Sequence, residues 1–231
     1  MKKHFILAGI FTLLTLGAAE TPVVLLEHNF TNGWQKMDKE NFSARIQIQQ
    51  RGRKPTAVTG KNADERAMRL YPESQIVLRN ARPKVPGAIV LQLKCSGKLT
   101  EQPARYIGTT NRPGPYLFYQ ESISLKKPFF HCGSHNLRPP AASQYNITHH
   151  GSTLPENVWN TIVINLKKNV IELWINGKKF QGAKTDFLNN DLYGDIAIGS
   201  QSNKFMTLDI ASLRVFGTAL SDAEIAELSK K

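Results

Sequence analysis

Apolar and polar residues alternate along several short runs of the chain, which is the period-two pattern of a half-buried β-strand. The runs at 161–166 and 170–176 show it most clearly, because every second residue is Ile or Leu. In the second run Trp174 falls on the face opposite these aliphatic residues. The pattern therefore predicts strands with two chemically different faces.

Turn residues separate these runs throughout the chain, and this rhythm is typical of an all-β sandwich. Two stretches, 97–115 and 134–155, are predicted to be long loops, the first with one short strand at 105–107. Long loops in a compact domain are often functional. The expected strands are 23–27, 44–50, 75–79, 88–95, 116–119, 128–132, 161–166, 170–176, 195–199 and 207–216.

Local signals define two turns and one helix in the second half. Residues 167–169 join two strands and predict a hairpin, and Asn176-Gly177 is a dipeptide that tolerates positive φ in a tight turn. Near the C-terminus, Ser221 and Glu224 have the spacing of a capping box, which predicts a short helix.

Three segments of the second half resemble the laminin G-like, concanavalin A-like jelly-roll domains of secreted proteins. They are the tryptophan-led strand 159–164, the Asn-Gly hairpin 171–178, and the last strand with its Ala-Leu-Ser-x-x-Glu-Ile helix at 213–225. The resemblance covers 155–229, and the first half matches in strand rhythm. Many members carry an acidic pair where this chain has Ala211 and Ser212.

The resemblance implies an all-β fold, namely a two-sheet antiparallel jelly-roll sandwich with a short C-terminal helix. It also implies binding of sugars, proteins or cell surfaces more often than catalysis, without indicating a particular ligand.

The N-terminus has the features of an export signal. Lys2 and Lys3 precede an apolar run that is short for a membrane span, and small residues end at Ala19. We expect a signal peptide at 1–19, a mature domain at 20–231, and a secreted or periplasmic location; an uncleaved anchor is the alternative. We expect no transmembrane segment after cleavage.

The formal charge is +12, and loss of Lys2 and Lys3 with the signal would leave +10. This balance is compatible with acidic partners such as uronic or sulfated polysaccharide, but a generally basic, soluble surface is the simpler explanation. A nucleic-acid partner is not expected, because no basic stripe interleaved with aromatic residues and no known module is visible.

The candidate ligand-binding residues are mainly cations and histidines of the long loops. Arginine binds carboxylate and sulfate groups with both arms of its fork, and an exposed indole covers the apolar face of a sugar. Ordinary loop polarity, or packing in the case of the tryptophan, is the alternative. The candidates are Arg105, Arg112, Trp174, His131, His135 and Arg138.

Two further sites are considered. A cluster containing Asp186, Asp191 and Asp195 could hold calcium, which prefers oxygen ligands, although Asp and Asn are also common in turns. Cys95 and Cys132 could form a disulfide in an oxidising compartment, or each could be a buried thiol.

The sequence favours a non-catalytic module that binds carbohydrate, with an anionic glycan as the sharper hypothesis. Sandwich glucanases need two carboxylates that flank the scissile bond, and no Glu-x-Asp-x-Glu run occurs in the chain. A glycoside hydrolase or polysaccharide lyase with dispersed catalytic residues, and a surface adhesion or structural protein, are the alternatives.

Overall fold

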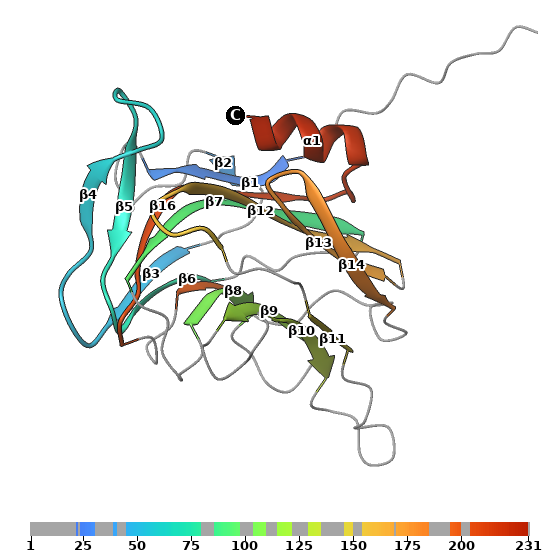
Figure 1. The fold of residues 1–231 in the computed structure, drawn as a ribbon, viewed down its shortest axis with the longest axis horizontal. Coiled ribbons are helices and arrows are strands. Elements are labelled where there is room, and N and C mark those ends of the chain that lie inside the picture. The colour runs from blue at the N-terminus through green and yellow to red at the C-terminus, as the bar shows by residue number, and fades with distance from the viewer. Residues whose placement is uncertain are drawn as a thin grey trace, which may run out of the picture.

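Two antiparallel sheets pack face to face in the computed structural model, and one short helix lies on the outside of the larger sheet (Figure 1). In the described part of the chain, no helix is long and apolar enough to cross a membrane. The structure describes residues 22, 24–30, 39–40, 45–79, 86–97, 104–109, 115–121, 129–134, 146–149, 154–168, 170–184, 195–199 and 204–230.

The larger sheet has the strand order β14-β13-β12-β7-β16-β1-β2, and the hairpin β4–β5 joins it where β5 pairs with β16. Its strands are β1 (Val24–Asn29), β2 (Lys39–Glu40), β4 (Thr56–Thr59), β5 (Arg66–Leu70), β7 (Gly87–Ser96), β12 (Trp159–Lys167), β13 (Val170–Ile175), β14 (Lys178–Lys184) and β16 (Thr207–Phe216).

The smaller sheet has the order β11-β10-β9-β8-β15-β6-β3. Its strands are β3 (Arg45–Gln50), β6 (Ser74–Arg79), β8 (Ala104–Thr109), β9 (Pro115–Glu121), β10 (Phe129–Ser134), β11 (Asn146–His149) and β15 (Ile196–Gly199). All described strand pairs are antiparallel, and the predicted all-β two-sheet sandwich with a C-terminal helix is confirmed.

The main core lies between the sheets and is built from every second residue of the central strands. On β7, the four residues at 89, 91, 93 and 95 all point inward and are at most 1% exposed. On β12 the inward positions are Ile162, Ile164 and Leu166. The period-two pattern therefore assigned the inner and outer faces of these strands correctly.

The predicted hairpin at 167–169 is confirmed, because Lys167 of β12 pairs with Val170 of β13. Asn176 and Gly177 both have positive φ, at 51° and 74°, in the turn that leads to β14. Other predictions were wrong: β4, β5 and β14 were missed, and β11 interrupts the predicted loop 134–155. Their polar and charged residues conceal the alternation, as Arg66 and Arg69 do in β5.

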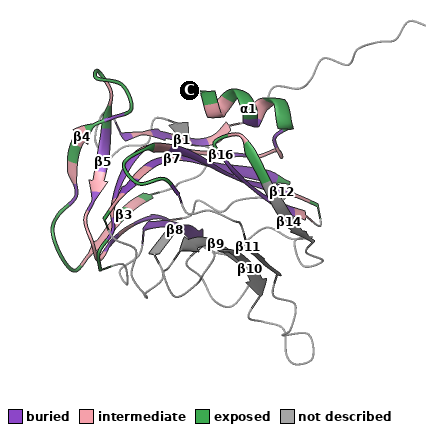
Figure 2. Ribbon diagram, in the orientation of Figure 1, coloured by how far each residue is buried: buried purple, intermediate pink, exposed green. Residues whose placement is uncertain are grey.

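The helix α1 (Asp222–Lys230) covers one half of the outer face of the larger sheet (Figure 2). Ile225 and Leu220 form a second apolar cluster with Val90, Val163 and Trp174 beneath them. The predicted capping box is confirmed, since the Ser221 backbone N–H donates to Glu224 Oε2 at 2.6 Å and the Glu224 N–H donates to Ser221 Oγ at 3.3 Å.

Candidate functional site

The outer face of the larger sheet changes character along its strands. Beneath α1 the outward residues include an apolar cluster, with Val90 of β7 and Val163 of β12 among its members. Two residues further along each strand, the outward positions carry Gln92 and Thr161, which face one another across the sheet. We call the apolar part the covered half and the polar part the open half. In the open half Gln92 is half-buried and Thr161 is 4% exposed, and Ser229 of α1 stands at its edge.

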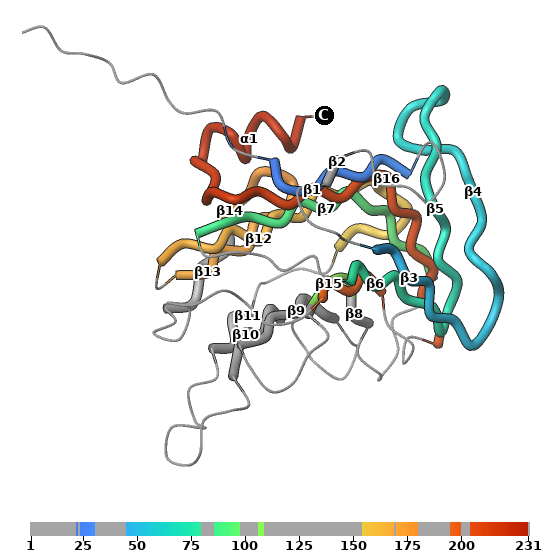
Figure 3. The backbone as a smooth tube through the Cα atoms, turned by 180° about the vertical axis from the view of Figure 1, so that it is seen from behind, coloured from blue at the N-terminus to red at the C-terminus, as the bar shows by residue number. Residues whose placement is uncertain are grey.

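Two raised elements flank the open half, namely α1 and the hairpin β4–β5, and both stand above the sheet when it is seen from the front and from behind (Figures 1 and 3). The hairpin connection is held by short-range bonds: the Gly60 N–H donates to the Glu65 carbonyl at 2.8 Å, and Asn62 Nδ2 donates to Glu65 Oε1 at 2.8 Å. A Cβ at Gly60 would lie 2.9 Å from the Glu65 Cβ, so this turn requires glycine.

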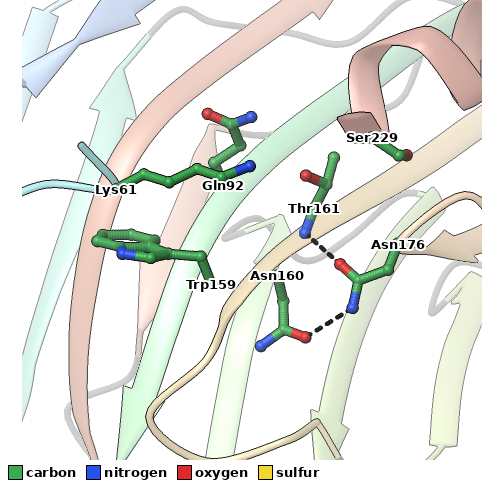
Figure 4. A pocket seen from close by; sticks show the side chains of 7 residues that line it. All are labelled: Lys61, Gln92, Trp159, Asn160, Thr161, Asn176 and Ser229. Carbon is green, nitrogen blue, oxygen red and sulfur yellow. Dashed lines mark hydrogen bonds between the residues drawn. The ribbon is translucent and has the colours of Figure 1, made fainter. Parts of the chain in front are cut away.

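Two hollows lie in the open half, and we call them together the polar groove. The first has a volume of about 150 Å³ and is lined by Lys61, Gln92, Trp159, Asn160, Thr161, Asn176 and Ser229 (Figure 4). The second has a volume of about 510 Å³ and is lined by Asn29, Asn62, Glu65, Arg66, Gln92, Ala211, Ser212 and Arg214. Gln92 lines both hollows, so they adjoin one another at this residue.

Hydrogen bonds fix the polar side chains of the floor. Ser212 Oγ donates to Gln92 Oε1 at 3.0 Å, which leaves the Gln92 amide nitrogen as a donor toward the groove. At one end of the groove, both polar atoms of the Asn176 side chain form hydrogen bonds. Its Oδ1 accepts the Thr161 N–H at 2.8 Å, and its Nδ2 donates to Asn160 Oδ1 at 2.9 Å (Figure 4). Asn176 therefore forms a fixed end of the groove.

A charged row borders the floor on the side away from α1. Asp209 is 2% exposed and accepts hydrogen bonds from Arg69 Nε at 2.6 Å and Arg69 Nη2 at 2.9 Å. This hydrogen bonding raises the pKa of Arg69 above its ordinary value despite partial burial. Lys94 Nζ lies 3.3 Å from Asp209 and 5.1 Å from the centre of the Trp159 ring, so the indole is held beside an ammonium.

The chemistry of the groove suits ligand binding. Its lining presents amide, hydroxyl, ammonium and guanidinium groups together with the partly exposed indole of Trp159. Glu65 is the sole carboxylate residue among the described residues that line the two hollows, and both of its oxygens accept hydrogen bonds from Asn62. This lining matches a ligand rich in hydroxyl groups that also has an apolar face.

The covered half contains a buried carboxylate that supports the helix. Glu172 is 5% exposed and lies 2.6 Å from Lys179 Nζ and 2.9 Å from Lys167 Nζ, and the Trp174 indole N–H donates to it at 3.3 Å. Burial pushes the pKa of Glu172 upward, but these hydrogen bonds outweigh that effect and lower the pKa below its ordinary value. The hydrogen bond that Lys179 donates to Glu172 likewise raises the pKa of Lys179.

The residues predicted from sequence as ligand contacts lie apart from the polar groove or outside the described residues. Trp174 is 5% exposed beneath α1, which favours the packing alternative for this residue. Arg105 lies in β8 and His131 in β10, but their side chains are not among those described. The remaining candidates, Arg112, His135 and Arg138, lie outside the described residues.

The predicted calcium site and disulfide remain predictions. One carboxylate oxygen of Asp195 accepts a hydrogen bond from Arg79 Nη1 at 2.8 Å. Asp186 and Asp191 lie outside the described residues. Within the described part of the chain, no three His, Cys, Asp or Glu side chains group as metal ligands. Cys95 is buried in the larger sheet with its sulfur 3.7 Å from the Pro155 carbonyl, and Cys132 lies on β10 of the smaller sheet.

Sequence reasoning missed the residues of the polar groove, although a signal was present. Gln92 and Thr161 occupy outward positions directly after or before an apolar outward residue, Val90 on β7 and Val163 on β12, so the change from apolar to polar on that face can be read in the sequence. Lys61 and Arg66 could not have been found in this way, because pairing of β5 with β16 brings their hairpin to the groove.

Solved structures with the same fold include carbohydrate and receptor-binding domains. Domain 4 of AbnA, an extracellular arabinanase of Geobacillus stearothermophilus solved with arabinotriose, is 16% identical with a TM-score of 0.70 over 91% of this chain and 100% of that one. The binding domain of botulinum neurotoxin serotype D is 14% identical with a TM-score of 0.64 over 90% of this chain and 50% of that one.

The binding domain of Paraclostridial Mosquitocidal Protein 1 is 14% identical with a TM-score of 0.63 over 90% of this chain and 52% of that one. The chain thus spans about half the length of these toxin domains. At these identities the likeness shows the fold alone. Among curated protein sequences, no significant match was found.

A family profile provides the assignment. Residues 98–226, more than half of the chain, match the profile of a laminin G-like family described as concanavalin A-like lectin/glucanases superfamily. This range includes the three segments that carry the resemblance in the sequence. The chain therefore belongs to the concanavalin A-like lectin/glucanases superfamily as a laminin G-like domain.

Proposed function

We propose that this chain is an exported, non-catalytic carbohydrate-binding domain, and that the polar groove is its binding site. One observation carries the proposal: the outer face of a single sheet has an apolar cluster, with its few buried polar groups paired internally, where α1 covers it, and changes to amides, hydroxyls and an indole along the groove. A surface that only had to be soluble would not need two flanking walls. Export, to a secreted or periplasmic location, rests on the signal-like segment 1–19.

The groove offers the two kinds of contact that sugars need. Gln92 and Thr161 supply hydrogen-bonding groups for hydroxyls, and Trp159 supplies a ring for the apolar face of a sugar. Figure 4 shows the Lys61 side chain reaching from the hairpin toward Gln92, above the floor of the groove. Lys61 is thus placed to contact a ligand from the opposite side.

An anionic glycan is the sharper form of the proposal. Arg66 lines the second hollow and is exposed, and the described residues give its guanidinium no carboxylate partner. Arg214 in the same hollow is engaged by Glu27 at 2.7 Å. Because a guanidinium binds the two oxygens of a carboxylate or sulfate, Arg66 would select glycans that carry such groups.

A glycan-array screen of residues 20–231, at low and at physiological salt and with and without calcium, tests the proposal. We expect binding to a defined glycan class, with weaker binding of uronic or sulfated glycans at higher salt. Failure to bind any glycan under all conditions would contradict the proposal and favour protein adhesion or an enzymatic role.

Variants of groove residues, compared with a control variant outside the groove, test whether the polar groove is the binding site. Trp159→Ala and Gln92→Ala should each reduce glycan affinity at least fivefold, because each removes a contact of about 1 kcal/mol or more. Arg66→Gln should reduce only the binding of anionic glycans, and Arg51→Gln, which changes another exposed arginine outside the groove lining, should leave all binding unchanged. Equal losses in both arginine variants would reject a specific role for Arg66.

A further inference from the structure

The floor of the polar groove carries one polar side chain on each of four adjacent strands, at matching register. Thr161 of β12 faces Gln92 of β7, Gln92 faces Ser212 of β16, and Ser212 faces Asn29 of β1. We call these four residues the polar ladder. The ladder runs perpendicular to the strands, from the first hollow into the second.

The rows on either side of the ladder differ from it. Toward α1, the outward residues Val90 and Val163 belong to the apolar cluster under the helix. Away from α1, Lys94 and Asp209 face one another and are engaged in an ion pair at 3.3 Å. On β7 and β12 the ladder therefore lies between an apolar row and a charged row, whereas on β16 and β1 its neighbours toward α1 are Arg214 and Glu27, which form an ion pair at 2.7 Å.

The length of the ladder sets the kind of ligand that can use all of it. Neighbouring strands are about 4.8 Å apart, so the ladder from β12 to β1 spans about 14 Å. A single sugar ring cannot reach from Thr161 to Asn29, whereas a few linked sugars can. The two hollows share Gln92, so a ligand chain that occupies both would pass over this residue and beside Lys61.

We propose that the polar ladder binds a linear oligosaccharide segment that lies across the strands, with successive sugar units over successive strands. This inference rests on the proposed function and specifies its ligand as the extended part of a glycan chain instead of a single terminal sugar. Gln92 holds the central position, because its amide orientation is fixed by Ser212 Oγ at 3.0 Å.

Titration calorimetry of residues 20–231 with oligosaccharides of increasing length tests the inference. The probes are two series of one to six units, neutral α-1,5-arabino-oligosaccharides and anionic oligogalacturonates, chosen to cover both charge classes. In the series that binds, affinity should rise at least tenfold from the monosaccharide to the tri- or tetrasaccharide and then level off, as the ladder becomes filled.

Variants at the two ends of the polar ladder test where the oligosaccharide lies. Thr161→Val keeps the side-chain shape and removes one hydroxyl, and Asn29→Ala removes an amide; each should lower tetrasaccharide affinity about fivefold, the effect of one lost hydrogen bond. Thr59→Val, at an exposed position of β4 outside the groove lining, is the matched control and should change nothing.

The outcomes separate this inference from the proposed function. Equal affinity for one and four units, or full tetrasaccharide binding by both Thr161→Val and Asn29→Ala, would overturn the ladder while carbohydrate binding stands. Absence of binding by every member of both series, together with a blank glycan array, would overturn the proposed function and the ladder with it.

Discussion

The two halves of the outer face of the larger sheet are built by the same strands and serve different purposes. Along β12, Val163 packs under α1, while Trp159 and Thr161 line the polar groove. Strand alternation sends all three outward, so backbone geometry alone does not separate them. The difference lies in what covers each residue: α1 packs on Val163, whereas Trp159 and Thr161 line the groove that we propose as the binding site.

The comparison also explains how each half is stabilised. In the covered half, buried polar groups are paired inside the protein, as Asn165 is with the backbone of Leu220 through bonds of 2.8 and 2.9 Å. In the open half, groups such as the Gln92 amide nitrogen keep bonding capacity toward the groove. Substitutions in the two halves should therefore separate stability from binding.

The largest expected contrast is between the two tryptophans of this face. Trp174→Ala should lower the free energy of unfolding by about 4 kcal/mol, because it empties a well-packed site beneath α1. Trp159→Ala should cost about 1 kcal/mol, since this ring is partly exposed, and should abolish most glycan binding. Urea denaturation and calorimetry of both variants provide the measurement. A larger stability loss in Trp159→Ala would reverse the assignment of the two halves.

The second-largest loss of stability should come from Asn165, whose side-chain amide bonds the backbone of Leu220 just before α1. Asn165 is 0% exposed, and Asn165→Ala would leave the N–H and C=O of Leu220 without their side-chain partner. We expect a loss of about 3 kcal/mol by urea denaturation, from two unmade buried hydrogen bonds. Gln92→Ala is the control amide in the open half, and a comparable loss of stability there would contradict the account.

The contribution of Glu172, in the covered half, to the free energy of unfolding should depend on pH. The folded-state pKa of Glu172 is lowered, so its contribution is present above the ordinary glutamate pKa of 4.5 and is lost as pH falls through the lower folded value. Glu172→Gln should therefore cost about 2 kcal/mol near neutral pH. The gap between wild type and variant should shrink on acidification from about pH 6 to about pH 3. A gap that stays constant would show that the charge of Glu172 is not the cause.

A small loss of stability should come from a substitution in the hairpin β4–β5, which flanks the groove. Gly60→Ala places a Cβ against Glu65 and should cost about 1 kcal/mol while moving the turn that carries Lys61 and Asn62. We expect weaker glycan binding with little change in melting temperature. Unchanged affinity would mean that this wall does not contact the ligand.

Sequence alone was sufficient for the strands at the centre of the sandwich and for the final helix. Ile162 and Ile164 show the alternation directly, and Ser221 with Glu224 shows the cap. It was insufficient for the hairpin β4–β5, where charged residues such as Arg66 and Arg69 conceal the pattern. It was also insufficient for the groove, because a site shared by β5, β7, β12 and β16 depends on strand order, which local patterns do not contain.

Fluorine NMR of the protein labelled with 5-fluorotryptophan tests the central claim most directly, because the chain has three tryptophans and one lies in each half of the outer face. Resonances would be assigned with Trp→Phe variants, and the oligosaccharide that binds best would be titrated. The account predicts that the Trp159 resonance shifts on saturation while the Trp174 resonance stays in place. Saturation that moves Trp34 or Trp174 and leaves Trp159 unchanged would contradict it.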